Sequence, residues 1–99
     1  MKQNGKQFDG TFFFDPADKI YADHFPGNPV VPGSLIVSAF IEAARTIGPA
    51  EGGYAIENFR FKEFISPGEY PFRVRTTTDR LHCELYNKSK AVVTGIVKL

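Results

Sequence analysis

Five segments rich in hydrophobic and aromatic residues are bounded by polar turn residues, and this pattern predicts five β-strands. The clearest case is the segment in which Leu81, Cys83 and Leu85 alternate with polar or amphipathic residues, as in a strand with one buried and one wetter face. Ser66-Pro67-Gly68, Asp79-Arg80 and Asn87-Lys88-Ser89 have turn composition and separate the later strands, and Asp15-Pro16 ends the first. The predicted strands are residues 8–14, 54–64, 70–78, 81–87 and 91–99.

Between the first and second predicted strands, the pattern changes to that of a helix. Residues 34–47 contain neither Pro nor Gly and are followed by Gly48-Pro49, a typical helix end. Ser34, Ser38 and Glu42 form a polar stripe at four-residue spacing, and most other positions are apolar. A helix that is apolar over most of its circumference is expected to be surrounded by other elements.

The order strand, buried helix, four strands predicts an α+β fold. An antiparallel sheet of five strands can bury such a helix only by curling round it, which is the hotdog architecture.

The 99 residues, 42% of them hydrophobic and 23% charged, suit one compact domain spanning residues 1–99. A domain of this size leaves much apolar surface exposed, so an oligomer is physically attractive.

Composition excludes several classes of protein. The single cysteine, Cys83, has no partner for an internal disulfide, and no Cys/His cluster suggests a metal site or any other cofactor. Residues 1–10 lack the apolar run of a secretory signal, and no segment has the length of a membrane span. We therefore expect a soluble, cytoplasmic protein. A net charge of +1 is too small to predict nucleic-acid binding.

A proline-rich motif before the predicted helix carries a family resemblance. Residues 24–33 read His-Phe-Pro-Gly-Asn-Pro-Val-Val-Pro-Gly. This string, opening an apolar helix, resembles the β-hydroxyacyl-acyl-carrier-protein dehydratases of fatty-acid synthesis, of the FabZ and FabA type. Residues 56–69, with an aromatic and basic stretch leading to a Pro-Gly turn and Glu69, are similar to the strand that follows the helix in that family.

The resemblance implies a role for several residues. His24 falls at the position of the catalytic histidine, which removes a proton from the carbon beside the thioester carbonyl. Gly33 falls where a backbone N–H at the helix start polarises that carbonyl. Phe25 is expected in the core or in the wall of an acyl tunnel.

The chain departs from the family at the general acid. In the family an Asp or Glu fourteen positions after the histidine protonates the departing hydroxyl, and that position here is Ser38. Glu42 is the nearest carboxylate on the same stripe, but four helical residues displace it by about 6 Å. Its ordinary interpretation is a surface ion pair with Arg45, and the ordinary interpretation of Ser38 is a small residue at a packing contact.

Three functions remain open on these residues. The first is a dehydratase that acts on (3R)-hydroxyacyl thioesters of acyl carrier protein or coenzyme A and yields the trans-2-enoyl thioester. In it, the acid would come from Glu42 or from a partner hotdog subunit. The second is a non-catalytic subunit that binds acyl chains or pairs with an active hotdog dehydratase, and the third is an acyl thioesterase.

The resemblance also predicts the assembly. The family order, without a further helix and strand that precede residues 8–14 in the dehydratases, gives the sheet order 1-3-4-5-2. Residues 54–61 are expected to pair with the same segment of a second subunit, in a homodimer or in a heterodimer with another hotdog protein.

Overall fold

The architecture is that of a curved sheet with one helix packed against its concave face. The structure, a computed structural model, describes residues 5–19, 29–47 and 53–98. Within these residues the order is β1 (Gln7–Phe14), α2 (Gly33–Ile47), β2 (Ala55–Phe61), β3 (Gly68–Thr76), β4 (Arg80–Asn87) and β5 (Lys90–Lys98).

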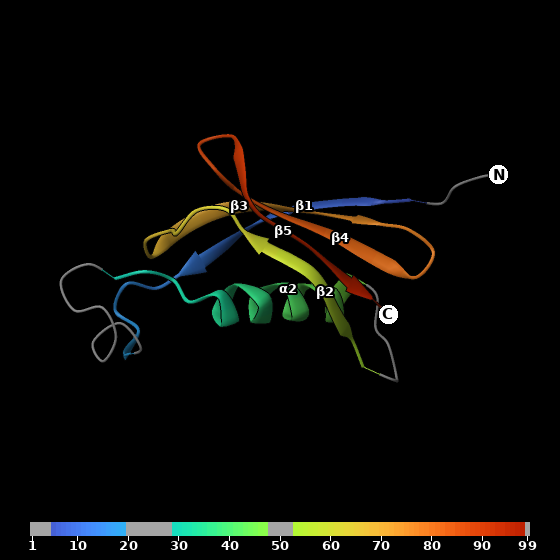
Figure 1. Ribbon diagram of the computed structural model, residues 1–99, viewed down its shortest axis with the longest axis horizontal. Helices are drawn as coiled ribbons and strands as arrows, with labels where there is room; N and C mark the ends of the chain where they lie inside the picture. The colour runs from blue at the N-terminus through green and yellow to red at the C-terminus, as the bar shows by residue number, and fades with distance from the viewer. Residues whose placement is uncertain (1–4, 20–28, 48–52, 99) are drawn as a thin grey trace.

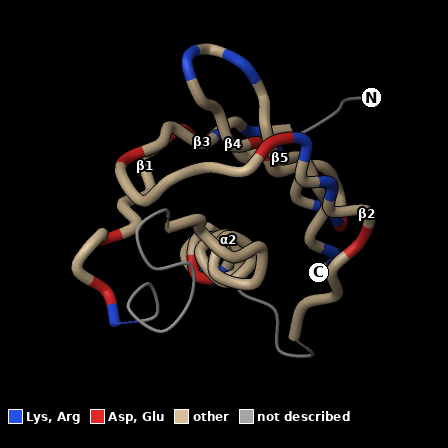
Figure 2. The backbone as a smooth tube through the Cα atoms, turned by 60° about the vertical axis from the view of Figure 1, so that its left-hand side comes forward, with Lys and Arg blue, Asp and Glu red and all other residues tan. Residues whose placement is uncertain are grey.

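The five strands form one antiparallel sheet in the order β1-β3-β4-β5-β2, which confirms the order that the family resemblance implied. Figure 1 shows α2 lying along the sheet, and Figure 2, turned from that view, shows the sheet arching over the helix. The outermost strands, β1 and β2, are therefore on either side of α2.

The core lies between α2 and the concave face of the sheet. Ile36, Phe40 and Ala44, one helical turn apart, are buried, and they face residues such as Val74, Leu85 and Val93 of the sheet. The ring of Phe40 has its centroid 5.0 Å from that of Phe12 and 6.0 Å from that of Phe72, both in edge-to-face contact. Removing a ring so enclosed costs about 3–5 kcal/mol.

The helix is less completely enclosed than its composition predicted. The flanking residues Leu35, Val37, Ala39, Ile41 and Ala43 are only half-buried, because the sheet covers one side of α2. The polar stripe of Ser34, Ser38 and Glu42 is exposed, so Ser38 is not at the packing contact that its ordinary interpretation predicted. No helix in the described part of the chain is both long and apolar enough to cross a membrane.

The turns follow from local chemistry. After β1, the Asp15 carboxylate accepts a hydrogen bond from the Ala17 N–H at 2.8 Å, which ends the strand. The β4–β5 hairpin has a two-residue turn at Lys88 and Ser89, whose φ angles are 54° and 67°. Two successive positive φ angles are typical of a type I′ turn, whose twist matches that of the strands.

Strand β2 ends at Phe61, three residues before the predicted Phe64, and is irregular. Its pairing with β5 shifts between Glu57 and Arg60, and Asn58 has a φ of 53°. This bulge turns the Phe59 ring towards the core, where it lies over Gly95. A Cβ at Gly95 would overlap that ring, so the close approach requires glycine.

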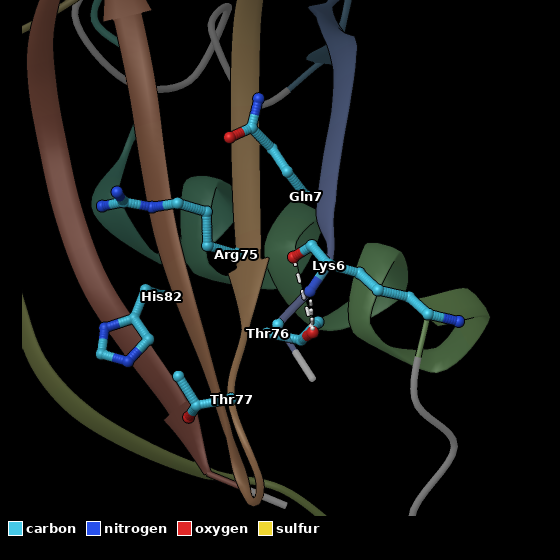
Figure 3. A pocket seen from close by; sticks show the side chains of 7 residues that line it. Lys6, Gln7, Arg75, Thr76, Thr77 and His82 are labelled. Atoms are coloured by element: carbon cyan, nitrogen blue, oxygen red, sulfur yellow. Dashed lines mark hydrogen bonds between the residues drawn. The ribbon is translucent and has the colours of Figure 1, made fainter. Parts of the chain in front are cut away.

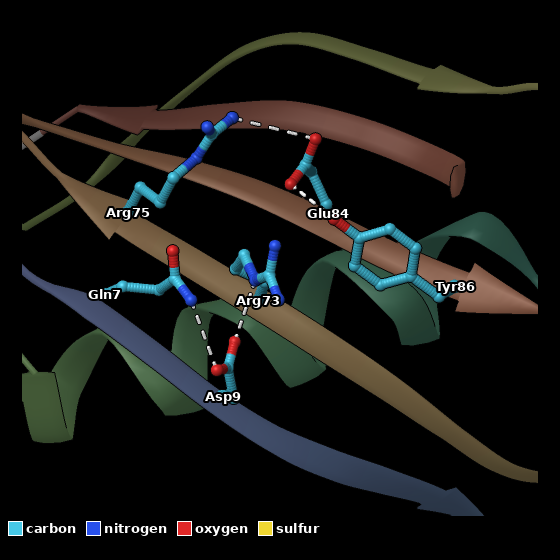
Figure 4. A network of polar contacts seen from close by, with 6 residues as sticks. All are labelled: Gln7, Asp9, Arg73, Arg75, Glu84 and Tyr86. Carbon is cyan, nitrogen blue, oxygen red and sulfur yellow. Dashed lines mark hydrogen bonds and ion pairs between the residues drawn. The ribbon is translucent and has the colours of Figure 1, made fainter. Parts of the chain in front are cut away.

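Polar side chains cover the convex face of the sheet. Arg73 of β3 donates to Asp9 of β1 at 2.9 Å, and this hydrogen bond lowers the pKa of the Asp9 carboxyl. Tyr86 donates to Glu84 at 2.6 Å, and Arg75 lies 3.7 Å from the same carboxylate. Figure 4 shows this network running across β1, β3 and β4, with α2 behind the sheet.

Candidate functional site

The start of α2 is fixed by a backbone hydrogen bond between two distant segments. The Val31 N–H donates to the Ile65 carbonyl at 2.9 Å, and both side chains are buried. The Pro32 carbonyl then accepts the first helical hydrogen bonds, from Leu35 at 3.0 Å and Ile36 at 3.3 Å. The loop after β2 therefore holds the N-terminus of the helix in place.

Gly33 is the first residue of α2, one position before the predicted helix start. The first N–H groups of a helix have no acceptor within it, and they lie at the positive end of its dipole. The ring of Phe61 comes within 3.1 Å of the place that a Cβ of residue 33 would occupy. A larger side chain here would push against Phe61, so Gly33 also permits close packing of β2 on the helix start.

Ser38 and Glu42 lie one helical turn apart on the flank of α2 beside β1. Both are exposed, and the Glu42 side chain retains 76% of its accessible surface. Glu42 Oε2 lies 3.9 Å from Arg45 Nε, so the predicted surface ion pair is present, although long and exposed. An ion pair of this kind contributes little to stability, and it leaves the carboxylate accessible.

Ser38 and Glu42 share a groove between α2 and β1. A hollow of about 270 Å³ is lined by Ser38 and Glu42 of α2 together with Phe13 and Phe14 of β1. A second hollow, of about 600 Å³, is lined by Glu42, Ala39 and Ala43 on the helix side. Because both include Ala39 and Glu42, we treat them as one α2–β1 groove.

Aromatic residues form the sheet side of this groove. Phe8, Phe12 and Phe72 line the larger hollow, and the Phe12 and Phe72 rings stack with centroids 4.0 Å apart. The sequence did not identify these residues as part of a site. One feature of the sequence could have indicated the groove. Ala39 and Ala43 are small residues one helical turn apart, and they leave room beside the helix.

Of the predicted site residues, the structure brings Ser38 and Glu42 together and places Gly33 at the helix start, against β2. His24 and Phe25 lie outside the described residues. In the part of the chain that is described, no three His, Cys, Asp or Glu side chains are grouped so as to hold a metal ion.

A five-stranded antiparallel sheet curled round one central helix defines a hotdog protein, and comparison with known proteins identifies the family. The family described as ApeI-like, ApeI dehydratase, matches residues 1–96. The chain belongs to this family of hotdog dehydratases.

Curated relatives are similar at low identity. The 3-hydroxyacyl-[acyl-carrier-protein] dehydratase FabZ of Herpetosiphon aurantiacus is 30% identical over 89 residues, covering 81% of this chain and 62% of the relative. FabZ of Agrobacterium fabrum is 33% identical over 78 residues, covering 65% of this chain and 51% of the relative. The chain thus spans between half and two thirds of the length of these relatives.

Solved structures share the fold across nearly the whole chain. An uncharacterized protein from Erwinia carotovora superposes with a TM-score of 0.73 at 20% identity, covering 99% of this chain and 86% of the other. The dehydratase heterocomplex ApeI:P from Xenorhabdus doucetiae gives 0.69 at 18% identity, covering 99% and 97%.

Proposed function

We propose that this chain is a dehydratase-type hotdog subunit that binds (3R)-hydroxyacyl thioesters of acyl carrier protein or coenzyme A. In a dimer it would remove water from them to give the trans-2-enoyl thioester. The observation that carries the proposal is the exposed stripe of α2, on which Ser38 and Glu42 lie beside a groove in a member of the dehydratase family.

In the proposed reaction, the His24 imidazole takes a proton from the carbon beside the thioester carbonyl. The electron pair of that C–H bond forms the double bond, and the bond to the β-hydroxyl breaks. The Gly33 N–H stabilises the negative charge on the carbonyl oxygen, as a preorganised donor at a helix N-terminus can. The departing hydroxyl must gain a proton to leave as water, and this step needs an acid.

Two groups on the polar stripe of α2 are candidates to supply that proton. Ser38, at the family's position, is a far weaker acid than a carboxylic acid. Glu42 is accessible, but it lies one helical turn, about 6 Å, further along the axis. Because an error of about 1 Å in the site can cost 10²-fold in rate, we propose that Glu42 acts weakly and that full activity requires a carboxylate from a partner subunit.

The position of the stripe supports a shared site. Ser34, Ser38 and Glu42 are exposed to solvent, so a group from another subunit can reach them. The edge strand β2 is suited to pairing with a second subunit, because Ile56 and Phe61 are exposed on it. The ApeI:P complex is itself a heterocomplex, which favours a heterodimer for this chain as well.

A second function, a non-catalytic partner subunit, is favoured by Ser38 itself. A chain that binds acyl groups but lacks a placed acid would still complete a dimer with an active hotdog subunit. The two functions differ in the activity of the homodimer. A dehydratase binds acyl thioesters and dehydrates them, whereas a non-catalytic partner subunit binds them without dehydration.

The experiment is incubation of the purified protein with 3-hydroxyacyl, enoyl and saturated acyl thioesters. We expect binding of all three, slow interconversion of the first two, and no release of free thiol. His24→Ala should abolish the interconversion and leave binding in place. Interconversion that survives in His24→Ala would contradict the dehydratase proposal, and release of thiol from the saturated thioester would indicate a thioesterase.

A further inference from the structure

The convex face of the sheet, opposite α2, carries a hollow in which positive side chains predominate. It has a volume of about 330 Å³ and lies over β2, β4 and β5. We call it the outer hollow. The side chains that matter for its chemistry are Arg60, Lys62, Arg75, His82, Glu84 and Thr94.

The charge of the outer hollow is positive even with His82 neutral. Arg60, Lys62 and Arg75 contribute three positive charges against the single negative charge of Glu84, a net charge of +2. Glu84 is already engaged, since it accepts a hydrogen bond from Tyr86 and lies 3.7 Å from Arg75. That distance leaves the guanidinium donors of Arg75 available to a ligand.

In the described part of the chain, Arg60 and Lys62, unlike Arg75, have no neighbouring carboxylate that balances their charge. Among residues 5–19, 29–47 and 53–98, no acidic side chain forms an ion pair with either of them. Two adjacent cations without counter-charge repel each other, and an anion bound between them would relieve this repulsion.

The bulge of β2 contributes to this arrangement. Asn58 lines the outer hollow, and its φ of 53° lies in the left-handed region that asparagine adopts more readily than most other residues. After the bulge Arg60 stands opposite Thr94 of β5, so its side chain shares the convex face with Thr94. Bulges commonly re-aim side chains beside binding sites.

A second hollow adjoins the first. It has a volume of about 460 Å³ and shares Arg75 and His82 with the outer hollow. These two residues stand directly opposite each other on β3 and β4. Figure 3 shows Arg75 and His82 on the same face of the sheet, with Thr77 beyond them. A ligand could therefore place an anionic group in the outer hollow and extend across the pair.

We propose that the outer hollow binds the phosphate groups of a diphosphate-containing ligand. Three cations within one shallow hollow suit a doubly charged group, and Arg75 offers the planar donor geometry that matches phosphate oxygens. The proposal does not rest on the dehydratase function, because α2 and its groove are on the other face of the sheet. Pairing through the β2 edge uses backbone groups in the plane of the sheet, so a dimer leaves this face open.

The test is a titration of the ¹⁵N-labelled protein, followed by amide NMR at constant ionic strength, with pyrophosphate, ADP and a 20-residue polyglutamate. We expect saturable shifts with pyrophosphate at Asn58, Arg60, His82 and Thr94. The variant Arg60→Gln/Lys62→Gln should bind at least about tenfold more weakly, because each charge-assisted hydrogen bond is worth that much. The control Arg45→Gln/Lys88→Gln removes the same charge elsewhere and should bind within about twofold of wild type.

The outcomes show whether the outer hollow binds an organic diphosphate, an inorganic anion or an acidic protein. Tighter binding of ADP than of pyrophosphate, with added shifts at Thr76 and Thr77, indicates an organic diphosphate; equal binding indicates the inorganic anion. Absence of saturable binding by wild type, or equal weakening in both double variants, overturns the proposal. Binding of polyglutamate without binding of either phosphate compound overturns it in favour of an acidic protein surface. If Arg60→Gln/Lys62→Gln does not fold, Arg75→Lys, which keeps the charge but loses the planar donor fork, should weaken pyrophosphate binding instead.

Discussion

Cys83 shows how the fold changes the chemistry of a single side chain. It lies on the concave face of β4 with 2% of its surface exposed, in the middle of the core. Burial raises the pKa of its thiol to about 12, because the thiolate would lose its hydration. The thiol therefore stays protonated near neutral pH and packs in the core as a small apolar group.

This raised pKa predicts a loss of stability in alkali. The unfolded chain releases the thiol proton near pH 8.5–9, whereas the folded chain keeps it up to about pH 12. Between these values the folded state binds more protons, so the free energy of unfolding should fall by up to about 1.4 kcal/mol per pH unit. Urea unfolding of wild type and Cys83→Ala between pH 8 and 10 measures this. The difference in free energy of unfolding between wild type and Cys83→Ala should shrink as pH rises. Parallel pH profiles of the two proteins would contradict a raised pKa at Cys83.

At the scale of elements, the β4–β5 hairpin has a turn whose residues do not match its backbone. Lys88 and Ser89 both adopt positive φ, where residues with a Cβ are strained and an Asn-Gly pair is favoured. Lys88→Asn/Ser89→Gly should raise the free energy of unfolding by about 1 kcal/mol, or the Tm by about 4–8 °C.

The control for this prediction is in the neighbouring hairpin. Thr78 lies in the β3–β4 connection without a positive φ, so Thr78→Gly should lower the Tm through lost chain stiffness. Thermal unfolding followed by circular dichroism measures both. An unchanged or lower Tm for the Lys88/Ser89 variant would show that the turn strain is already relieved elsewhere.

The elements could be predicted because their signals are local. Period-two alternation marked β4, Asp15-Pro16 marked the end of β1, and Gly48-Pro49 marked the end of α2. The irregular course of β2 was not predictable, because its pairing with β5 and the packing of the Phe59 ring on Gly95 join residues that are distant in sequence. Nor could the sequence show that the flanks of α2 stay half-buried, since this depends on how far the sheet curls.

The sequence could place candidate residues along α2, but it could not predict what surrounds them. The motif and its spacing identified Gly33, Ser38 and Glu42, and the structure shows the last two on one groove. The Phe8, Phe12 and Phe72 wall of that groove comes from two strands that pair only in the folded sheet. The close contact of Phe61 with Gly33 is likewise a consequence of tertiary structure.

At the scale of the whole molecule, the two sides of the sheet are chemically different. The concave side holds α2, the apolar core and the α2–β1 groove, whereas the convex side carries the charged network and the outer hollow. The two edge strands also differ in position, with β1 beside the groove and β2 beside the start of α2. An assembly through β2 therefore brings a partner close to the helix start.

The predicted dimer can be tested at that edge. Ile56 on β2 has 43% of its surface exposed, and a charge there would be placed at the proposed interface. Ile56→Asp should convert a dimer into a monomer at micromolar concentration, measured by light scattering. Phe13→Asp on the opposite edge, where 61% of the side chain is exposed, is the matched control and should remain dimeric. A monomeric wild-type protein, or dissociation caused only by Phe13→Asp, would contradict the prediction.

The central claim is that Ser38 occupies the position of the missing acid, and kcat/KM for a 3-hydroxyacyl thioester tests it most directly. A placed general acid is worth about 10²–10⁴ in rate. If the rest of the site is intact, Ser38→Glu should raise kcat/KM of the homodimer by about 10²-fold, and Glu42→Gln should change it by less than about threefold. A fast wild-type homodimer that Glu42→Gln inactivates, with no gain in Ser38→Glu, would show that the carboxylate of Glu42 is the acid.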